Sequence, residues 1–111
     1  MKDATTLEAK RYLATVFPEW KAFWFNKGPI ARNMKELAAV LPGVPSVMYN
    51  YHVSGSKNDL AAWVKDVLGD AELAKELKGA KTAKDAADLV NKRLKQLDKV
   101  LVISVPAKKK K

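Results

Sequence analysis

An apolar stripe at helical spacing in the middle of the chain constrains the fold most strongly. Five large apolar residues stand at positions 0, +3, +4, +7 and +8: Leu60, Trp63, Val64, Val67 and Leu68. This spacing is typical of one face of an amphipathic helix. Asn58 can cap the start of that helix, Asp59 favours its first turn, and Gly69 can adopt the left-handed conformation that ends it. The sequence therefore predicts a helix here, with Trp63 in the core.

The same signals predict three further helices. One follows a cap at Asn33 and stops at Pro42–Gly43, one follows a cap at Asp70 and stops at Gly79, and the longest starts at Thr82. Apolar residues at helical spacing support all three. They are Met34, Leu37, Ala38 and Leu41 in the first, Leu73, Ala74 and Leu77 in the second, and Ala86, Leu89, Val90, Leu94 and Leu97 in the third.

Two segments admit two interpretations each. Residues 5–16 form either a weak first helix capped by Thr6 or an extended arm, and Pro18 ends any helix before it. After Pro45, Ser46 can cap a short helix, but residues 49–53 alternate loosely and also fit a strand.

Two runs favour strands. Residues 22–25 are Ala-Phe-Trp-Phe, followed by the turn signal of residues 26–29, and residues 100–105 are apolar and rich in β-branched side chains. We expect both to be strands, which could pair with each other. Alternation places Phe23 and Phe25 on one face and Trp24 on the other. We expect both faces to be covered, although an exposed Trp24 beside lysines could stack a single-stranded base.

These elements predict a mainly α-helical chain of about four short helices with a small β element, in a single compact α+β-type domain. A length of 111 residues suits one domain. We expect residues 1–17 to be an N-terminal arm or weak helix, residues 18–105 to be the globular domain, and residues 106–111 to be a disordered lysine tail.

Residue types that support catalysis or metal binding are sparse. The chain has no cysteine, which excludes disulfides, thiol nucleophiles and thiolate zinc sites. Its single histidine, His52, lies in no metal-binding motif, and the glycines and serines form no phosphate-binding loop or nucleophile elbow. We expect no enzyme, no metal, no cofactor and no small-molecule substrate.

No stretch of 18 apolar residues is present, and the first residues lack the apolar segment of a secretory signal. We therefore expect a cytoplasmic protein without membrane contact.

The positive charge is concentrated at the C-terminal end. Residues 1–80 carry 11 basic and 9 acidic residues, a net of +2, whereas residues 81–111 carry 10 basic and 3 acidic, a net of +7. Such asymmetry is typical of chains that bind a polyanion. We expect phosphate contacts from Lys92, Arg93, Lys95, Lys99, Lys108, Lys109, Lys110 and Lys111. If the last four all contact phosphates, the slope of log K against log salt should be about −3.6 from these residues alone.

The order of several motifs resembles a known family. The motifs are Ala-Phe-Trp-Phe at residues 22–25, Asn-Met-Lys-Glu-Leu at 33–37, Tyr-His-Val at 51–53, Lys-Asn-Asp-Leu at 57–60, Trp-Val at 63–64 and Val-Leu-Gly-Asp at 67–70. Over about residues 18–78 the chain resembles a small, mostly archaeal domain family of unknown function, with Leu60 where that family has phenylalanine. The resemblance implies a cytoplasmic prokaryotic protein and supplies no activity.

Two functions are therefore weighed. The first is a non-catalytic basic protein that binds DNA or RNA through phosphates without sequence specificity, nucleoid-associated if its ligand is DNA. The alternative is a protein-protein interaction module that uses the Tyr49–Asp59 surface, with the lysine tail serving only solubility. The partner surface would comprise Tyr51, His52, Lys57 and Asp59. In the simpler structural interpretation, Asn58 caps a helix, Tyr51 packs and His52 hydrogen-bonds a nearby carbonyl.

Overall fold

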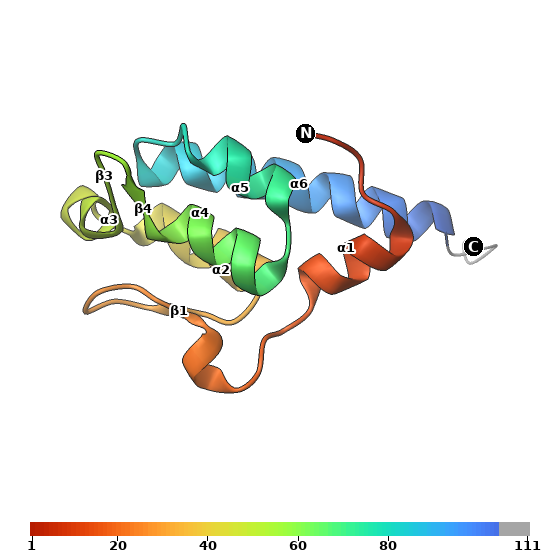
Figure 1. Cartoon of the computed structure of the whole chain (residues 1–111), viewed down its shortest axis with the longest axis horizontal. Helices are drawn as coiled ribbons and strands as arrows, with labels where there is room; N and C mark the ends of the chain where they lie inside the picture. The colour runs from red at the N-terminus through yellow and green to blue at the C-terminus, as the bar shows by residue number, and fades with distance from the viewer. Residues whose placement is uncertain (105–111) are drawn as a thin grey trace.

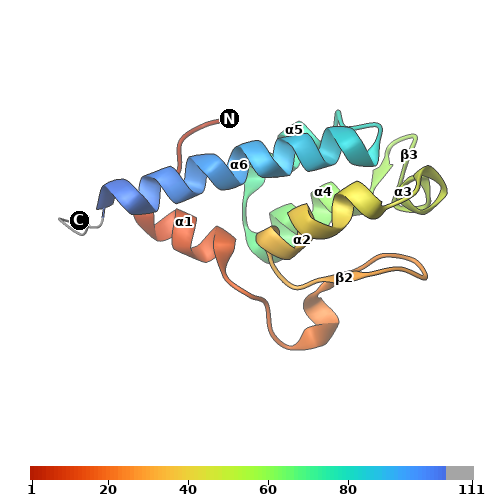
Figure 2. The same cartoon turned by 180° about the vertical axis from the view of Figure 1, so that it is seen from behind.

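A long C-terminal helix, α6 (Ala83–Ser104), runs along the molecule in the computed structural model, which describes residues 1–104 (Figure 1). Three shorter helices pack against α6: α1 (Thr6–Leu13), α2 (Met34–Val40) and α5 (Ala71–Leu77). Figure 2 shows α1 beside the C-terminal half of α6 and α2 beside its N-terminal half. The helices enclose one continuous core, so the described chain is a single compact domain.

The predicted helix caps are present. The side chain of Asn33 accepts a hydrogen bond from the backbone N–H of Glu36 at 2.8 Å, and Asn58 does the same for Ala61 at 2.8 Å. Asp70 caps α5 through the N–H of Leu73 at 3.1 Å. These side chains replace hydrogen bonds that the first turn of a helix cannot make internally, so each helix begins where its cap predicts.

The central helix is confirmed and ends at the predicted glycine. It consists of α4 (Asp59–Trp63) and a wider π-helical turn, η3 (Val64–Leu68). Gly69 has a φ of +87°, a conformation that residues with a Cβ rarely adopt. Trp63 is buried as expected, and its indole Nε1 donates to the carbonyl of Lys21 at 2.7 Å.

Both ambiguous segments are helical. Helix α1 begins one residue earlier than the cap at Thr6 would allow, because Thr5 caps it in a reciprocal pair with Glu8. Ala9 and Tyr12 of α1 are buried in the common core. The other segment is α3 (Ser46–His52), which follows Pro45 directly and contains Ser46 as its first residue rather than its cap.

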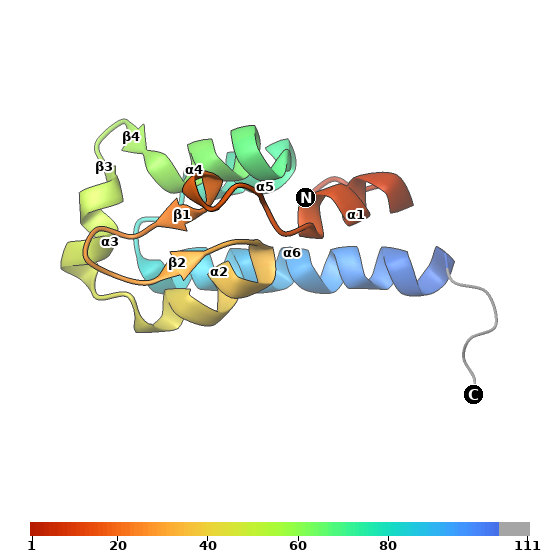
Figure 3. The ribbon, with the colours of Figure 1, turned by 90° about the horizontal axis from the view of Figure 1, so that it is seen from below.

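The first predicted strand is confirmed, but its partner differs from the expected one. Strand β1 (Phe23–Trp24) pairs antiparallel with β2 (Ile30–Ala31), across the predicted turn. A second short hairpin joins β3 (Val53–Ser54) to β4 (Lys57–Asn58). Figures 1 and 3 show that the β1–β2 hairpin lies across one side of α2 and α4.

The alternation along β1 is confirmed and the coverage of its outer face is not. Phe23 and Phe25 are buried, while 52% of the Trp24 side chain is exposed. The expectation that both faces are covered is therefore wrong for Trp24, whose indole Nε1 reaches the carbonyl of Glu19 while about half of its surface stays exposed.

The strand expected at residues 100–105 is also wrong over its described part. Residues 100–104 continue α6, and residue 105 lies outside the described residues. Leu94, Leu97 and Leu101 are spaced as one helical face, and α1 packs against α6. This packing outweighs the β propensity of a β-branched run.

The number of helices exceeds the predicted value. The described residues contain six α-helices and two small antiparallel hairpins, where about four helices and one β element were expected. The additional helices are α1 and α3, the two segments for which the sequence left a choice. Within residues 1–104, no helix is long and apolar enough to cross a membrane.

Candidate nucleic-acid interface

Three exposed lysines form a stripe on α6. Lys92, Lys95 and Lys99 stand at i, i+3 and i+7, so they lie on one face of the helix and span roughly 10 Å along its axis. All three are exposed, and none forms an ion pair with any residue in the described part of the chain. We call these three residues the α6 lysine stripe.

Arg93 does not belong to this stripe, which corrects the expectation that it contacts phosphates. Only 1% of the residue is exposed, and its guanidinium forms a bidentate pair with buried Asp70, Nε to Oδ2 at 2.7 Å and Nη2 to Oδ1 at 2.9 Å. Nη1 donates to the carbonyl of Lys2 at 2.7 Å and to Oε1 of Gln96 at 2.6 Å. Four of the five guanidinium N–H groups are used in these bonds and the side chain is buried, so Arg93 stabilises the fold.

The other four lysines expected to contact phosphates, residues 108–111, lie outside the described residues.

The four residues of the expected partner surface lie together at the end of α3 and the β3–β4 hairpin. His52 Nδ1 is 3.0 Å from Asp59 Oδ2, and the rings of Tyr51 and His52 meet edge to face with centroids 4.9 Å apart. Lys57 Nζ donates to the carbonyl of Tyr51 at 2.8 Å and lies 4.9 Å from the centre of the Tyr51 ring. We call these four residues the Tyr51 cluster, in which Tyr51 is 54% exposed.

His52 has a structural position within this cluster. It is buried, and its Nε2 accepts a hydrogen bond from the backbone N–H of Asn26 at 2.9 Å. Since Nε2 accepts a hydrogen bond, Nδ1 carries the ring N–H and donates a hydrogen bond to Asp59. Its partners are therefore a carboxylate and an amide N–H, where a carbonyl was expected. Neither ring nitrogen is open to a substrate or a metal ion.

Tyr49, the first residue of the Tyr49–Asp59 surface, belongs to the core. Its hydroxyl donates to the carbonyl of Ala80 at 2.8 Å. Burial, reinforced by the negative charge of Asp85, raises the pKa of Tyr49 to about 12.

Beside the Tyr51 cluster lies an open groove of about 750 Å³ between the β3–β4 hairpin, α4 and α5. Its charged lining residues are Lys57, Lys65, Lys78, Lys81 and Asp66. We call this the lysine groove. The net charge of residues 1–80 is only +2, so counting charge along the sequence does not reveal this groove. Several carboxylates in that count form ion pairs outside the groove: Glu19 and Glu36 with Arg32, and Asp70 with Arg93.

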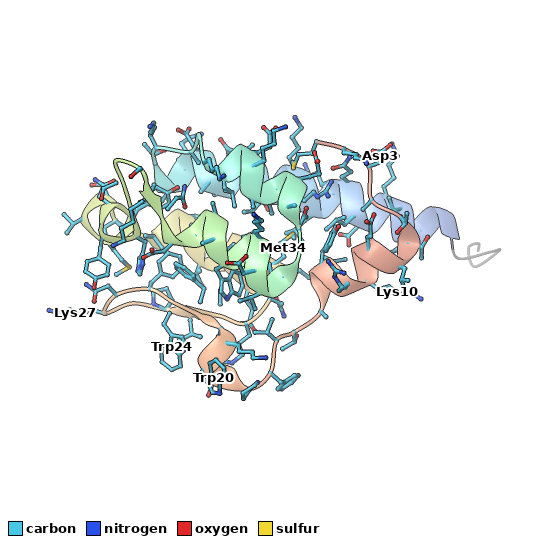
Figure 4. The ribbon with its side chains drawn as sticks, in the orientation of Figure 1. Asp3, Lys10, Trp20, Trp24, Lys27 and Met34 are labelled. Carbon is cyan, nitrogen blue, oxygen red and sulfur yellow. The ribbon has the colours of Figure 1, made fainter. Side chains whose placement is uncertain are left out.

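A group of exposed aromatic side chains lies near the β1–β2 hairpin. Trp20 is 73% exposed and Phe17 is exposed as well, and both precede Trp24 by a few residues in the sequence. Figure 4 shows Trp20 and Trp24 projecting from the same edge of the molecule. The aromatic run itself was the signal for these residues, but sequence alone does not say which rings the fold leaves uncovered.

In residues 1–104, no group of three or more potential metal-ligating side chains lies close enough together to hold a metal ion. Comparison with protein-family models, with curated proteins and with solved structures gives no match for this chain.

Proposed function

We propose that this protein binds nucleic acid without catalysing a reaction, through contacts to phosphates that carry no sequence preference. The observation that supports the proposal most is the α6 lysine stripe, whose three ammonium groups form no ion pair in the described chain. Closely spaced cations without counter-charges attract a polyanion, which gains by releasing its own condensed counterions.

The other charges on the same helix support this interpretation by contrast. Lys84 is paired with Asp88 at 3.2 Å, one turn along α6, and Arg93 is buried against Asp70. The other basic residues of α6 are the three lysines of the stripe, and they form no ion pair with any residue in the described chain. Phosphate contacts from a helix face position a protein on nucleic acid and do not read bases, so no sequence preference is expected.

The experiment is a fluorescence-anisotropy titration of the full chain against a labelled 12-base-pair DNA duplex and a labelled 12-nucleotide single strand at 50 and 200 mM salt. The variant Lys92→Gln/Lys95→Gln/Lys99→Gln should bind more weakly. Its salt slope should be shallower by about 2.7 on the duplex or about 2.1 on the single strand, from roughly 0.9 and 0.7 per contact. Lys10→Gln/Lys35→Gln/Lys75→Gln removes equal charge from α1, α2 and α5 and is the matched control.

A chain that ends at Ala107 tests the last four lysines in the same titration. If they contact phosphates, the slope falls further, and if they serve only solubility it does not change. Unchanged affinity and slope in the α6 variant would contradict the proposal.

The Tyr51 cluster supports a second candidate, docking of a protein partner. Tyr51 is exposed, and Lys57 and the edge of His52 hold its ring in place, which suits a binding anchor. A pull-down with the wild-type chain and Tyr51→Ala tests this candidate. A partner that the wild-type chain retains at high salt and Tyr51→Ala loses would favour docking, because docking depends less on salt than phosphate binding does.

The family resemblance and a cytoplasmic location stay predictions, and a nucleoid location is proposed only if DNA is the ligand.

A further inference from the structure

Two of the three tryptophan residues are largely exposed to solvent. Trp20 is 73% exposed and Trp24 is 52% exposed, whereas Trp63 is 8% exposed. Tryptophan is strongly buried on average, because its large apolar surface is unfavourable in water. Two exposed rings within five residues, on one edge of a small domain, therefore mark a binding surface.

The segment that carries these rings is held in place. Trp24 Nε1 donates to the carbonyl of Glu19 at 3.3 Å, and Trp63 Nε1 donates to the carbonyl of Lys21 at 2.7 Å. The backbone of Trp24 pairs with Ile30 in the β1–β2 hairpin. A surface that is already ordered loses less conformational entropy when it binds.

One cation without an ion pair in the described chain, Lys21, lies next to Trp20. Lys21 Nζ is 5.5 Å from the centre of the Trp20 ring. A hollow of about 380 Å³ beside Trp20 is lined by Lys21 and by Asp66. Asp66 also lines the lysine groove, so the two surfaces adjoin.

The lysine groove is suited to an extended anion. Lys65, Lys78 and Lys81 are exposed and form no ion pair in the described chain, while Lys57 is held by the Tyr51 carbonyl and Asp59. Asp66 is the one carboxylate among the lining residues, against four lysines. Lys81 stands two residues before α6, so the groove lies near the N-terminal end of the helix that carries the α6 lysine stripe further along.

We infer that the ligand is single-stranded nucleic acid, with phosphates in the lysine groove and unpaired bases stacked on Trp20 and Trp24. The inference rests on the proposed function and adds to it the form of the ligand and a second site. Every base has a flat face that stacks on an aromatic ring, and only an unpaired base can offer that face to a protein. In a duplex the neighbouring base pairs cover both faces.

A protein partner is the other occupant that exposed tryptophans attract. The lysine groove favours nucleic acid, since its three unpaired ammonium groups match the phosphates of such a ligand and the groove adjoins the hollow beside Trp20 at Asp66. In the test, protein binding is an outcome that counts against the inference.

The test compares labelled oligo(dT) of 12 nucleotides with a 12-base-pair duplex. Trp20→Ala/Trp24→Ala should weaken single-strand binding by about tenfold or more, and duplex binding by less than twofold. Trp20→Phe/Trp24→Phe should recover most of the affinity, since phenylalanine also stacks. Leu7→Ala, which truncates an exposed apolar side chain on α1, is the control and should have no effect. Far-ultraviolet circular dichroism checks that each variant is folded.

The salt dependence separates the two halves of the site. Lys65→Gln/Lys78→Gln/Lys81→Gln should make the single-strand slope shallower by about 2.1, while the tryptophan variant should lower the affinity with its slope unchanged. Lys2→Gln/Lys10→Gln/Lys35→Gln removes the same charge away from the groove; Figure 4 shows Lys10 on α1, far from the tryptophans.

The outcomes of the inference and of the proposed function are distinguishable. If the tryptophan variant binds the single strand as tightly as the wild-type chain while the α6 variant binds more weakly, the inference is wrong and the proposed function holds. If the tryptophan variant only loses self-association or a protein partner, the inference is also wrong. If the wild-type chain binds neither probe at 50 mM salt, both are wrong.

Discussion

Arg93 and Asp70 form a bidentate ion pair in the core, although 23 residues separate them in the sequence, with Nε to Oδ2 at 2.7 Å and Nη2 to Oδ1 at 2.9 Å. Neither side chain is more than 1% exposed. Asp70 also caps α5 through Leu73, so one carboxylate fixes a helix end and joins α5 to α6.

The first prediction concerns this pair. Arg93→Met should lower the free energy of unfolding by about 3–5 kcal/mol, because it leaves the Asp70 carboxylate buried without a partner. Arg93→Met/Asp70→Ala should cost less than the sum of the two single changes. Urea unfolding measures both. The exposed neighbour Lys92→Gln is the control, expected within about 0.5 kcal/mol of the wild-type chain. An Arg93→Met variant of wild-type stability would refute the role given to the pair.

The second prediction concerns Gly69. Its φ of +87° disfavours any side chain, and a Cβ there would lie 2.5 Å from Nη2 of Arg11. Gly69→Ala should destabilise the protein by about 1–2 kcal/mol, mostly through the backbone, because the Arg11 side chain is flexible enough to move. Gly43→Ala is the matched control. A Cβ at Gly43 meets nothing within 4 Å, so a neutral or slightly stabilising effect in thermal unfolding is expected.

The positions predicted from sequence are those governed by local chemistry. Asn33, Asn58 and Asp70 cap helices because a short side chain with an oxygen can reach the N–H groups of the next turn. Gly69 ends the central helix for an equally local reason. The inward faces of Phe23 and Phe25 followed from strand alternation alone.

The features that sequence did not predict depend on contacts distant along the chain. Arg93 looked like one more cation in a basic segment, and only the position of Asp70 across the core makes it structural. The β-branched composition of residues 100–104 favours a strand, but these residues continue α6, against which α1 packs. The lysine groove combines residues of four separate segments, so no count along the sequence reveals it.

The third prediction concerns Asn58, whose amide makes two contacts. Its Oδ1 accepts from the Ala61 N–H at 2.8 Å, and its Nδ2 donates to the Leu77 carbonyl at 3.0 Å. Asn58→Ala should cost about 1–2 kcal/mol. Asn58→Ser keeps a capping oxygen and removes the donor to Leu77 without adding a charge, so its loss in chemical unfolding should be smaller. Equal losses for both variants would show that the cap contributes nothing.

The fourth prediction is a pH dependence from Tyr49. Burial and the charge of Asp85 raise the pKa of Tyr49 to about 12 in the folded state, against about 10 for an unfolded chain. Between these values the unfolded state binds fewer protons than the folded one, so stability falls as the pH rises. The stabilisation that the neutral Tyr49 hydroxyl contributes is fully present below about pH 10 and is lost as the pH approaches about 12. Urea unfolding from pH 9 to 11 should show a steeper decline in the wild-type chain than in Tyr49→Phe. Parallel curves would contradict the assignment.

The salt dependence of nucleic-acid binding tests the central proposal most directly. The slope of log K against log salt is measured between 50 and 200 mM on a labelled 12-nucleotide single strand, for the wild-type chain, for Lys92→Gln/Lys95→Gln/Lys99→Gln and for the charge-matched Lys10→Gln/Lys35→Gln/Lys75→Gln. We expect a slope shallower by about 2.1 in the α6 variant only. An equal change in both variants, or no binding by the wild-type chain at 50 mM salt, would contradict the proposal.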